Sequence, residues 1–158
     1  MTEILNVTTC VDAPAPAIFA VLTDPANHAA IDGTGWVRES LDGEMLSQLG
    51  QIFRIAMYHD NHPDGHYEMA NKITAYQADR AIGWEPGQAG PGGNIEFGGW
   101  TWCYNLDAVD DQQTRVTLTY DWSAVPPALR EHIQFPPFPV SHLEQSLANL
   151  ATLVGARA

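Results

Sequence analysis

Residues 99–106, GWTWCYNL, and residues 114–122, TRVTLTYDW, decide the fold of this chain. Large apolar side chains occupy every second position in both: Trp100, Trp102, Tyr104 and Leu106, then Val116, Leu118, Tyr120 and Trp122. Side chains two residues apart share one face of an extended strand, so each stretch predicts a strand with an aromatic-aliphatic face and a polar face. The polar stretch 108–113 between them predicts a turn. We therefore expect a hairpin whose two apolar faces lie on the same side.

More strands are predicted on the N-terminal side of this hairpin. Residues 4–11, 51–59 and 67–73 alternate between apolar and polar side chains, and Ile82 with Trp84 marks a further strand. The Gly- and Pro-rich segment 85–94, EPGQAGPGGN, is predicted to be a loop that ends this strand. Short strands that follow one another without helices indicate an antiparallel meander.

Helical spacing is found after the first strand. Ile18, Phe19 and Leu22 recur at helical intervals in a segment that has prolines near its start, and Asp24-Pro25 ends it. A second short helix is expected over residues 26–30.

Helical spacing returns near the C-terminus. Pro126-Pro127 is expected to open a short helix, and the later S-x-x-E pattern of Ser141 and Glu144 predicts a capping box. Four apolar residues then form one helical stripe: Leu143, Leu147, Leu150 and Val154. This stripe needs a partner, and the aromatic face of the strands is the obvious candidate.

Composition and charge limit the classes of partner. The chain has 158 residues, suited to one domain, and a formal net charge of −12 from 19 acidic and 7 basic residues. Such a surface repels phosphate backbones and anionic lipid, so we expect no nucleic-acid partner. No apolar stretch approaches the roughly 20 residues of a membrane span, and no leader pattern is found. With two cysteines that do not suggest pairing, a cytoplasmic protein without membrane insertion is expected.

The order of elements and several local motifs resemble the START/SRPBCC superfamily, and within it the polyketide cyclase/dehydrase-like proteins. The motifs are VDAPAPAIFAVLTDP at 11–25, GQIFRIAM at 50–57, AIGWEP at 81–86 and HLEQSLANL at 142–150. The resemblance implies a single ligand-binding domain over residues 1–158 with the α+β helix-grip fold. In that fold a curved antiparallel sheet wraps around a long C-terminal helix, and two short helices follow the first strand.

The resemblance also implies an apolar cavity between sheet and helix. Family members bind lipids, sterols, plant hormones or polyketides there; some catalyse cyclisation, and others act as chaperone co-activators. We expect this chain to bind a small hydrophobic molecule, with a cyclase/dehydratase-type enzyme and a chaperone co-activator as alternatives. No cofactor is expected and no catalytic residue is assigned; the oligomeric state stays open, with a homodimer as one possibility.

The alternation of side chains along the predicted strands and the apolar stripe of the C-terminal helix indicate the candidate ligand-binding residues. An inward amide such as Asn71 costs about 1–3 kcal/mol if it stays unpaired, so its partner is a tyrosine, a water or a ligand. The aromatic residues among the candidates can also be interpreted as ordinary core, without a ligand. The candidates are Phe53, Met57, Tyr67, Met69, Asn71, Trp84, Trp100, Trp102, Tyr104, Tyr120, Leu147 and Leu150.

Histidines supply the remaining candidates. His28, followed by Asp32, and His59 are expected at the mouth of the cavity, although a surface turn also explains the first two. The segment 59–66, HDNHPDGH, contains three histidines and two aspartates, a composition that can bind metal. Its turn-forming residues and its spacing favour a solvated hairpin, so no metal site is predicted.

Overall fold

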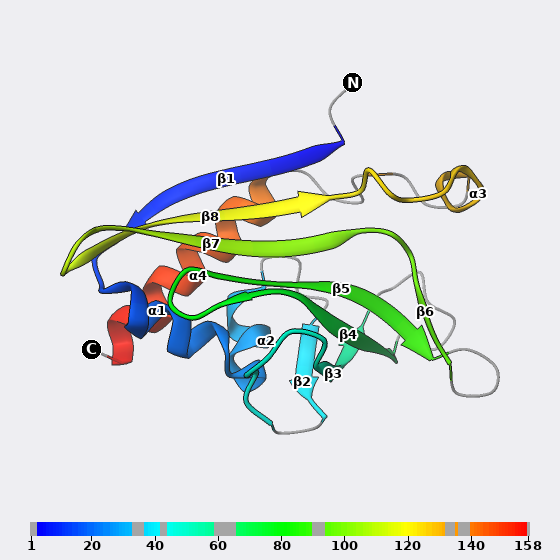
Figure 1. The fold of residues 1–158 in the computed structure, drawn as a ribbon, viewed down its shortest axis with the longest axis horizontal. Helices are drawn as coiled ribbons and strands as arrows, with labels where there is room; N and C mark the ends of the chain where they lie inside the picture. Colours follow the sequence, from blue (N-terminus) through cyan, green and yellow to red (C-terminus); the bar gives the residue numbers. More distant parts are fainter. Residues whose placement is uncertain are drawn as a thin grey trace.

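An antiparallel sheet forms the protein, with the long C-terminal helix and the helices that follow the first strand on one side (Figure 1). The structure is a computed structural model that describes residues 3–32, 37–41, 44–58, 66–89, 94–131, 135 and 140–157. Within these residues the sheet contains β1 (Ile4–Val11), β2 (Val37–Ser40), β3 (Ile52–Tyr58), β4 (His66–Gln77), β5 (Ala81–Ala89), β6 (Ile95–Phe97), β7 (Thr101–Asp110) and β8 (Gln113–Asp121). Its order is β1-β8-β7-β5-β4-β3-β2, and β6 pairs with β5.

The predicted hairpin is confirmed as β7 and β8. Trp102 pairs with Tyr120 and Tyr104 with Leu118, so the aromatic positions of the two strands lie on one face. The turn is short and involves residues 111–112. One row of inward side chains crosses five adjacent strands by register: Ile73, Trp84, Trp102, Tyr120 and Leu5.

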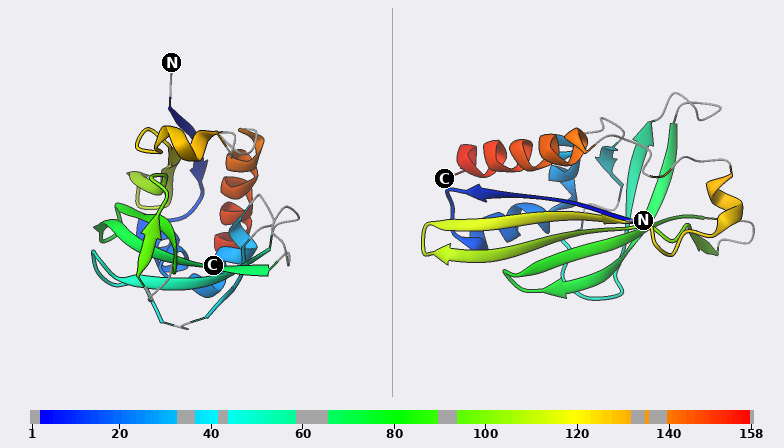
Figure 2. Two further views of the ribbon diagram at one scale, coloured as in Figure 1. Left: turned by 90° about the vertical axis from the view of Figure 1, so that its right-hand side faces the viewer. Right: turned by 90° about the horizontal axis from the view of Figure 1, so that it is seen from above.

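The helices are α1 (Ala15–Leu22), the 3-10 turn η1 (Pro25–Asn27), α2 (His28–Ile31), α3 (Pro127–Arg130) and α4 (Ser141–Arg157). The sheet curves around α4, which runs along β1 on the same side as α1 and α2 (Figure 2). The predicted stripe of α4 is buried throughout, and α4 contacts β1, β8, α1 and α2. The α+β class, the two short helices after the first strand and the long C-terminal helix are therefore confirmed.

The loop predicted after Trp84 was only partly right. The segment after Trp84 is not wholly a loop, because β5 continues to Ala89. Residues 81–84 of β5 pair with β7 and residues 87–89 pair with β6. Pro86, which has no N–H to donate, falls between these two pairings. The short strands β2 and β6 were not predicted.

The helix start at residue 141 also differs from the prediction. Ser141 lies inside α4 instead of capping it. The carbonyl of Val140 accepts from the N–H groups of Leu143 and Glu144, at 3.0 and 3.2 Å. The helix therefore begins one residue earlier than a Ser141 capping box requires.

Across the residues that the structure describes, no helix combines the length and apolar character needed to cross a bilayer.

Candidate functional site

His28 lies at the centre of an aromatic cluster inside the fold. Its ring stacks on Trp84, with 5.1 Å between centroids and 18° between planes, and meets the edge of Phe53 at 5.6 Å. Phe53 and Trp84 also meet edge to face at 5.6 Å. The sequence prediction put His28 at a cavity mouth, but the structure buries it, 7% exposed, at the start of α2. The stacking against β5 holds the ring inward.

The hydrogen bond of His28 fixes its tautomer. Nε2 lies 2.9 Å from the carbonyl oxygen of Leu22, which can only accept, so Nε2 carries the hydrogen. In the neutral ring, Nδ1 is then an acceptor. Burial lowers the pKa of His28 below 6.5, although the Leu22 hydrogen bond and the charges of Asp24 and Asp32 oppose this. His28 is therefore a neutral imidazole at neutral pH.

Asn71 is buried at its predicted inward position on β4. It pairs in register with Phe53 of β3 and Pro86 of β5 and is 6% exposed. Among the described residues its side chain forms no hydrogen bond, and its amide atoms are not completely enclosed. No described tyrosine therefore forms a hydrogen bond with the amide. Of the three partners expected from the sequence, a water and a ligand remain.

Tyr104 of β7 presents a second polar group of the same kind. It is 5% exposed, and its ring lies 6.2 Å from that of Trp84. Its hydroxyl has no hydrogen bond to any residue in the described ranges, yet it is not fully enclosed. Burial, followed by the charge of Asp32, raises the pKa of Tyr104 far above its ordinary value. The hydroxyl therefore stays protonated and can both donate and accept.

Asp32 connects the polar groups of this region electrostatically. It follows α2, and its Oδ2 accepts from the N–H of Val37 at 3.1 Å. Burial and then the charge of Asp32 raise the pKa of Tyr67, as they do for Tyr104, and the same charge acts on His28. Side chains from α2, β4 and β7 thus share one electrostatic neighbourhood. We call His28, Asn71, Trp84 and Tyr104 the polar-aromatic site.

A second aromatic group lies where β7 begins and β8 ends. The rings of Trp102 and Tyr120 are 4.6 Å apart, and those of Tyr120 and Trp122 are 5.7 Å apart. Trp100 lies 5.7 Å from Phe135. Trp100 and Trp102 are half-buried, whereas Tyr120 and Trp122 belong to the core.

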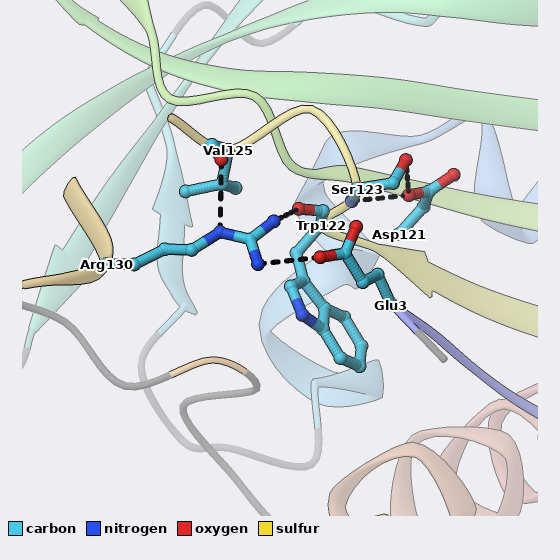
Figure 3. A network of polar contacts seen from close by, with 6 residues as sticks. All are labelled: Glu3, Asp121, Trp122, Ser123, Val125 and Arg130. Atoms are coloured by element: carbon cyan, nitrogen blue, oxygen red, sulfur yellow. Dashed lines mark hydrogen bonds and ion pairs between the residues drawn. The ribbon is translucent and has the colours of Figure 1, made fainter. Parts of the chain in front are cut away.

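Arg130 of α3 holds the segment that follows β8 (Figure 3). Its Nη2 donates to the carbonyl of Trp122 at 2.9 Å, and its Nε donates to that of Val125 at 3.0 Å. Its Nη1 pairs with Glu3 Oε1 at 2.7 Å. The sequence does not predict this contact, because the partners of Arg130 are two backbone carbonyls and a residue 127 positions away.

The other predicted ligand-binding residues divide by burial. Phe53, Met69, Tyr120, Leu147 and Leu150 are buried, and Met57, Tyr67, Trp84, Trp100 and Trp102 are half-buried. His59 and most of the segment 59–66 lie outside the described residues. The signal for the inward position of His28 is weak in the sequence, since only the fold brings residue 28 against residue 84.

Comparisons with known proteins give relatives in sequence and in structure. No family model matches the chain. An uncharacterized protein of Mycobacterium tuberculosis, Rv0088, is 28% identical over 114 residues, which are 72% of this chain and 45% of that protein. The corresponding protein of a second strain, MT0096, is 27% identical over the same length. The chain thus spans about half the length of the curated relatives it matches.

Solved structures match nearly the whole chain. Protein Ms6760 from Mycobacterium smegmatis is similar with a TM-score of 0.69 and 19% identity, covering 99% of this chain and 94% of that one. Norcoclaurine synthase from Thalictrum flavum, in complex with dopamine and hydroxybenzaldehyde, has a TM-score of 0.63 and 13% identity over 100% and 89% of the two chains. The ZhuI aromatase/cyclase from Streptomyces has a TM-score of 0.61 and 14% identity over 98% and 94%. At these identities the likeness concerns the fold alone, and the helix-grip fold expected from the sequence is confirmed.

Proposed function

We propose that the protein binds a small hydrophobic molecule in a cavity between the sheet and α4. The observation that carries this proposal is the unpaired state of Asn71 and Tyr104. Both side chains are buried, neither has a hydrogen-bond partner among the described residues, and neither polar group is completely enclosed. A buried polar group that lacks a partner costs about 1–3 kcal/mol, so a space that admits a polar partner explains both groups at once.

The composition of the interior supports the same proposal. Ligand sites are mostly apolar and aromatic, with a few polar groups that fix orientation. Around Asn71 and Tyr104 lie Trp84, Phe53 and the neutral ring of His28. The norcoclaurine synthase structure holds two small aromatic molecules, and this chain shares its fold.

Two measurements test the proposal. Native mass spectrometry of the protein purified from its own host is expected to show a retained small molecule, and the neutral dye Nile red is expected to bind saturably at one site. In Asn71→Phe a ring replaces the amide and would fill the space that the ligand is expected to occupy, so this variant should lose both the molecule and the dye. Asn6→Phe, an equal change at an exposed position on β1, should keep both. Absence of a retained molecule together with unsaturable dye binding would reject the proposal.

An enzyme of the cyclase or dehydratase type is a second candidate, favoured by the chemistry of His28 and Tyr104. A neutral imidazole whose Nδ1 is an acceptor suits a general base, and a phenol held protonated suits a hydrogen-bond donor to a developing oxyanion. The expected outcome is turnover of an aromatic polyketide chain by the wild type, with a large loss of kcat in His28→Gln and in Tyr104→Phe. Inertness of the wild type towards a panel of such chains would leave binding as the function.

A further inference from the structure

We infer that the bound molecule is uncharged and is held through its carbonyl or hydroxyl groups by Asn71 and Tyr104, and that carboxylates and phosphates are excluded. This inference rests on the proposed binding function and names its ligand class. It separates the neutral sterol-like and polyketide-like candidates from fatty acids and phospholipids, all of which are hydrophobic.

The two unpaired groups are both electrically neutral. The amide of Asn71 offers donors and an acceptor, and the hydroxyl of Tyr104 offers one donor and acceptor sites. They come from β4 and β7, the two strands that flank β5; Asn71 pairs with Pro86 and Tyr104 with Ile82, and both side chains are buried. Such groups match the oxygen of a ketone, a phenol or an alcohol, and they carry no charge with which to balance an anion.

The chain has no spare cation for the interior in the part that the structure describes. Its basic side chains number seven in total. Arg130 is occupied by Glu3 and two carbonyls, and the side chain of Arg157, at the end of α4, lies outside the description. The stretches that the structure leaves undescribed contain no lysine or arginine in the sequence. The remaining five are exposed: Arg38, Arg54, Lys72, Arg80 and Arg115.

The local charge is negative where an anion would have to sit. Asp32 is close enough to Tyr67 and Tyr104 for its charge to raise the pKa of both phenols. His28 does not compensate for it, because burial keeps the imidazole neutral. A buried carboxylate without a partner cation is costly, so an anionic ligand would lose affinity relative to its neutral analogue.

An amine is also disfavoured, for a different reason. Asp32 is the acidic group whose charge acts on Tyr104, and its Oδ2 already accepts from the N–H of Val37. A buried ammonium group needs a carboxylate and further acceptors directed at it. Asn71 and Tyr104 instead present a mixture of donors and acceptors, which suits a neutral oxygen better.

A series of ligands on one ring system tests the inference. Displacement of Nile red is measured with 2-acetylnaphthalene, 2-naphthoate and 2-(aminomethyl)naphthalene at about pH 8, where ordinary histidines are neutral. The ketone is expected to bind at least about tenfold more tightly than the acid or the amine, the equivalent of one hydrogen bond. In Asn71→Leu the ketone should lose about tenfold, whereas 2-methylnaphthalene, which has no polar group, should not weaken. Asn6→Leu is the matched control and should change neither.

The outcomes separate this inference from the proposed function. If the naphthoate or the amine binds as tightly as the ketone, the ligand class is wrong while the binding function stands. The same holds if Asn71→Leu weakens the ketone and 2-methylnaphthalene equally, or if the dye binds and no naphthalene displaces it. If the dye itself does not bind saturably, the proposed function fails.

Discussion

The imidazole of His28 lies stacked on the indole of Trp84, with ring centroids 5.1 Å apart and planes inclined by 18°. The two residues are 56 positions apart in the sequence and belong to α2 and β5. The contact fastens a helix of four residues, too short to be stable alone, to the middle of the sheet. It also places a neutral acceptor beside the aromatic face, so the same pair serves the fold and the candidate chemistry.

Replacement of His28 by alanine should therefore destabilise the protein. The change removes the ring contacts and leaves the carbonyl of Leu22 without its donor, each worth about 1 kcal/mol or more. We expect a loss of about 2–3 kcal/mol in the free energy of unfolding, measured by urea denaturation. His28→Phe keeps a ring against Trp84 and loses only the hydrogen bond, so its loss should be about half as large. Equal losses in the two variants would mean that the stacking contributes nothing.

Stability should also depend on pH through His28. The pKa of His28 is below 6.5 in the fold, so the unfolded chain binds the proton first as the pH falls. The contribution of His28 is complete above the unfolded pKa of about 6.5 and is lost as the pH falls from there towards the folded pKa. Urea denaturation at about pH 7.5 and 5.5 should show a smaller drop for His28→Phe than for the wild type. An equal drop in both proteins would place the pH dependence on other groups.

Loss of Arg130 should lower the free energy of unfolding more than loss of Arg115, although both arginines form ion pairs. Arg130 donates to two carbonyls and Glu3, whereas Arg115 reaches Asp107 at 3.9 Å with both side chains exposed. We expect Arg130→Met to cost about 1–3 kcal/mol, because two carbonyls lose their donor. Arg115→Met should cost less than about 1 kcal/mol. Thermal and urea unfolding of the two variants measure this difference, and equal costs would mean that the Arg130 contacts are not formed in solution.

The parts of the fold that follow local periodicity could be predicted from the sequence. The alternation in residues 99–106 and 114–122 predicted β7 and β8, and the apolar stripe that includes Leu143 and Leu150 predicted α4. Each of these elements repeats one pattern over several residues, so a single local exception does not hide it. The inward parity of Asn71 was predicted in the same way.

The parts that depend on distant partners could not be predicted. β6 contains three residues and exists because β5 changes partner beyond Pro86. The inward position of His28 depends on Leu22 and Trp84, neither of which marks residue 28 locally. The influence of Asp32 on Tyr104 likewise follows from chain folding and leaves no spacing pattern in the sequence.

The hydroxyl of Tyr104 allows a last test, because a second buried hydroxyl in the chain differs in one respect. Thr114 is also buried, but its Oγ1 donates to the carbonyl of Ala13 at 2.9 Å, whereas no described residue pairs with the Tyr104 hydroxyl. Thr114→Val should cost about 1–2 kcal/mol, because it leaves that carbonyl unpaired. Tyr104→Phe should leave the free energy of unfolding within about 0.5 kcal/mol of the wild type or raise it, because no hydrogen bond within the protein is lost.

In ligand binding the order of the two variants should be reversed, with Tyr104→Phe the more affected. Tyr104→Phe should weaken 2-acetylnaphthalene in the dye-displacement assay, and Thr114→Val should leave it unchanged. A residue that is neutral for folding and costly for binding has its partner in the ligand. If Tyr104→Phe instead destabilises the fold as much as Thr114→Val does, the hydroxyl has a partner within the protein, and Asn71 alone would have to hold the ligand.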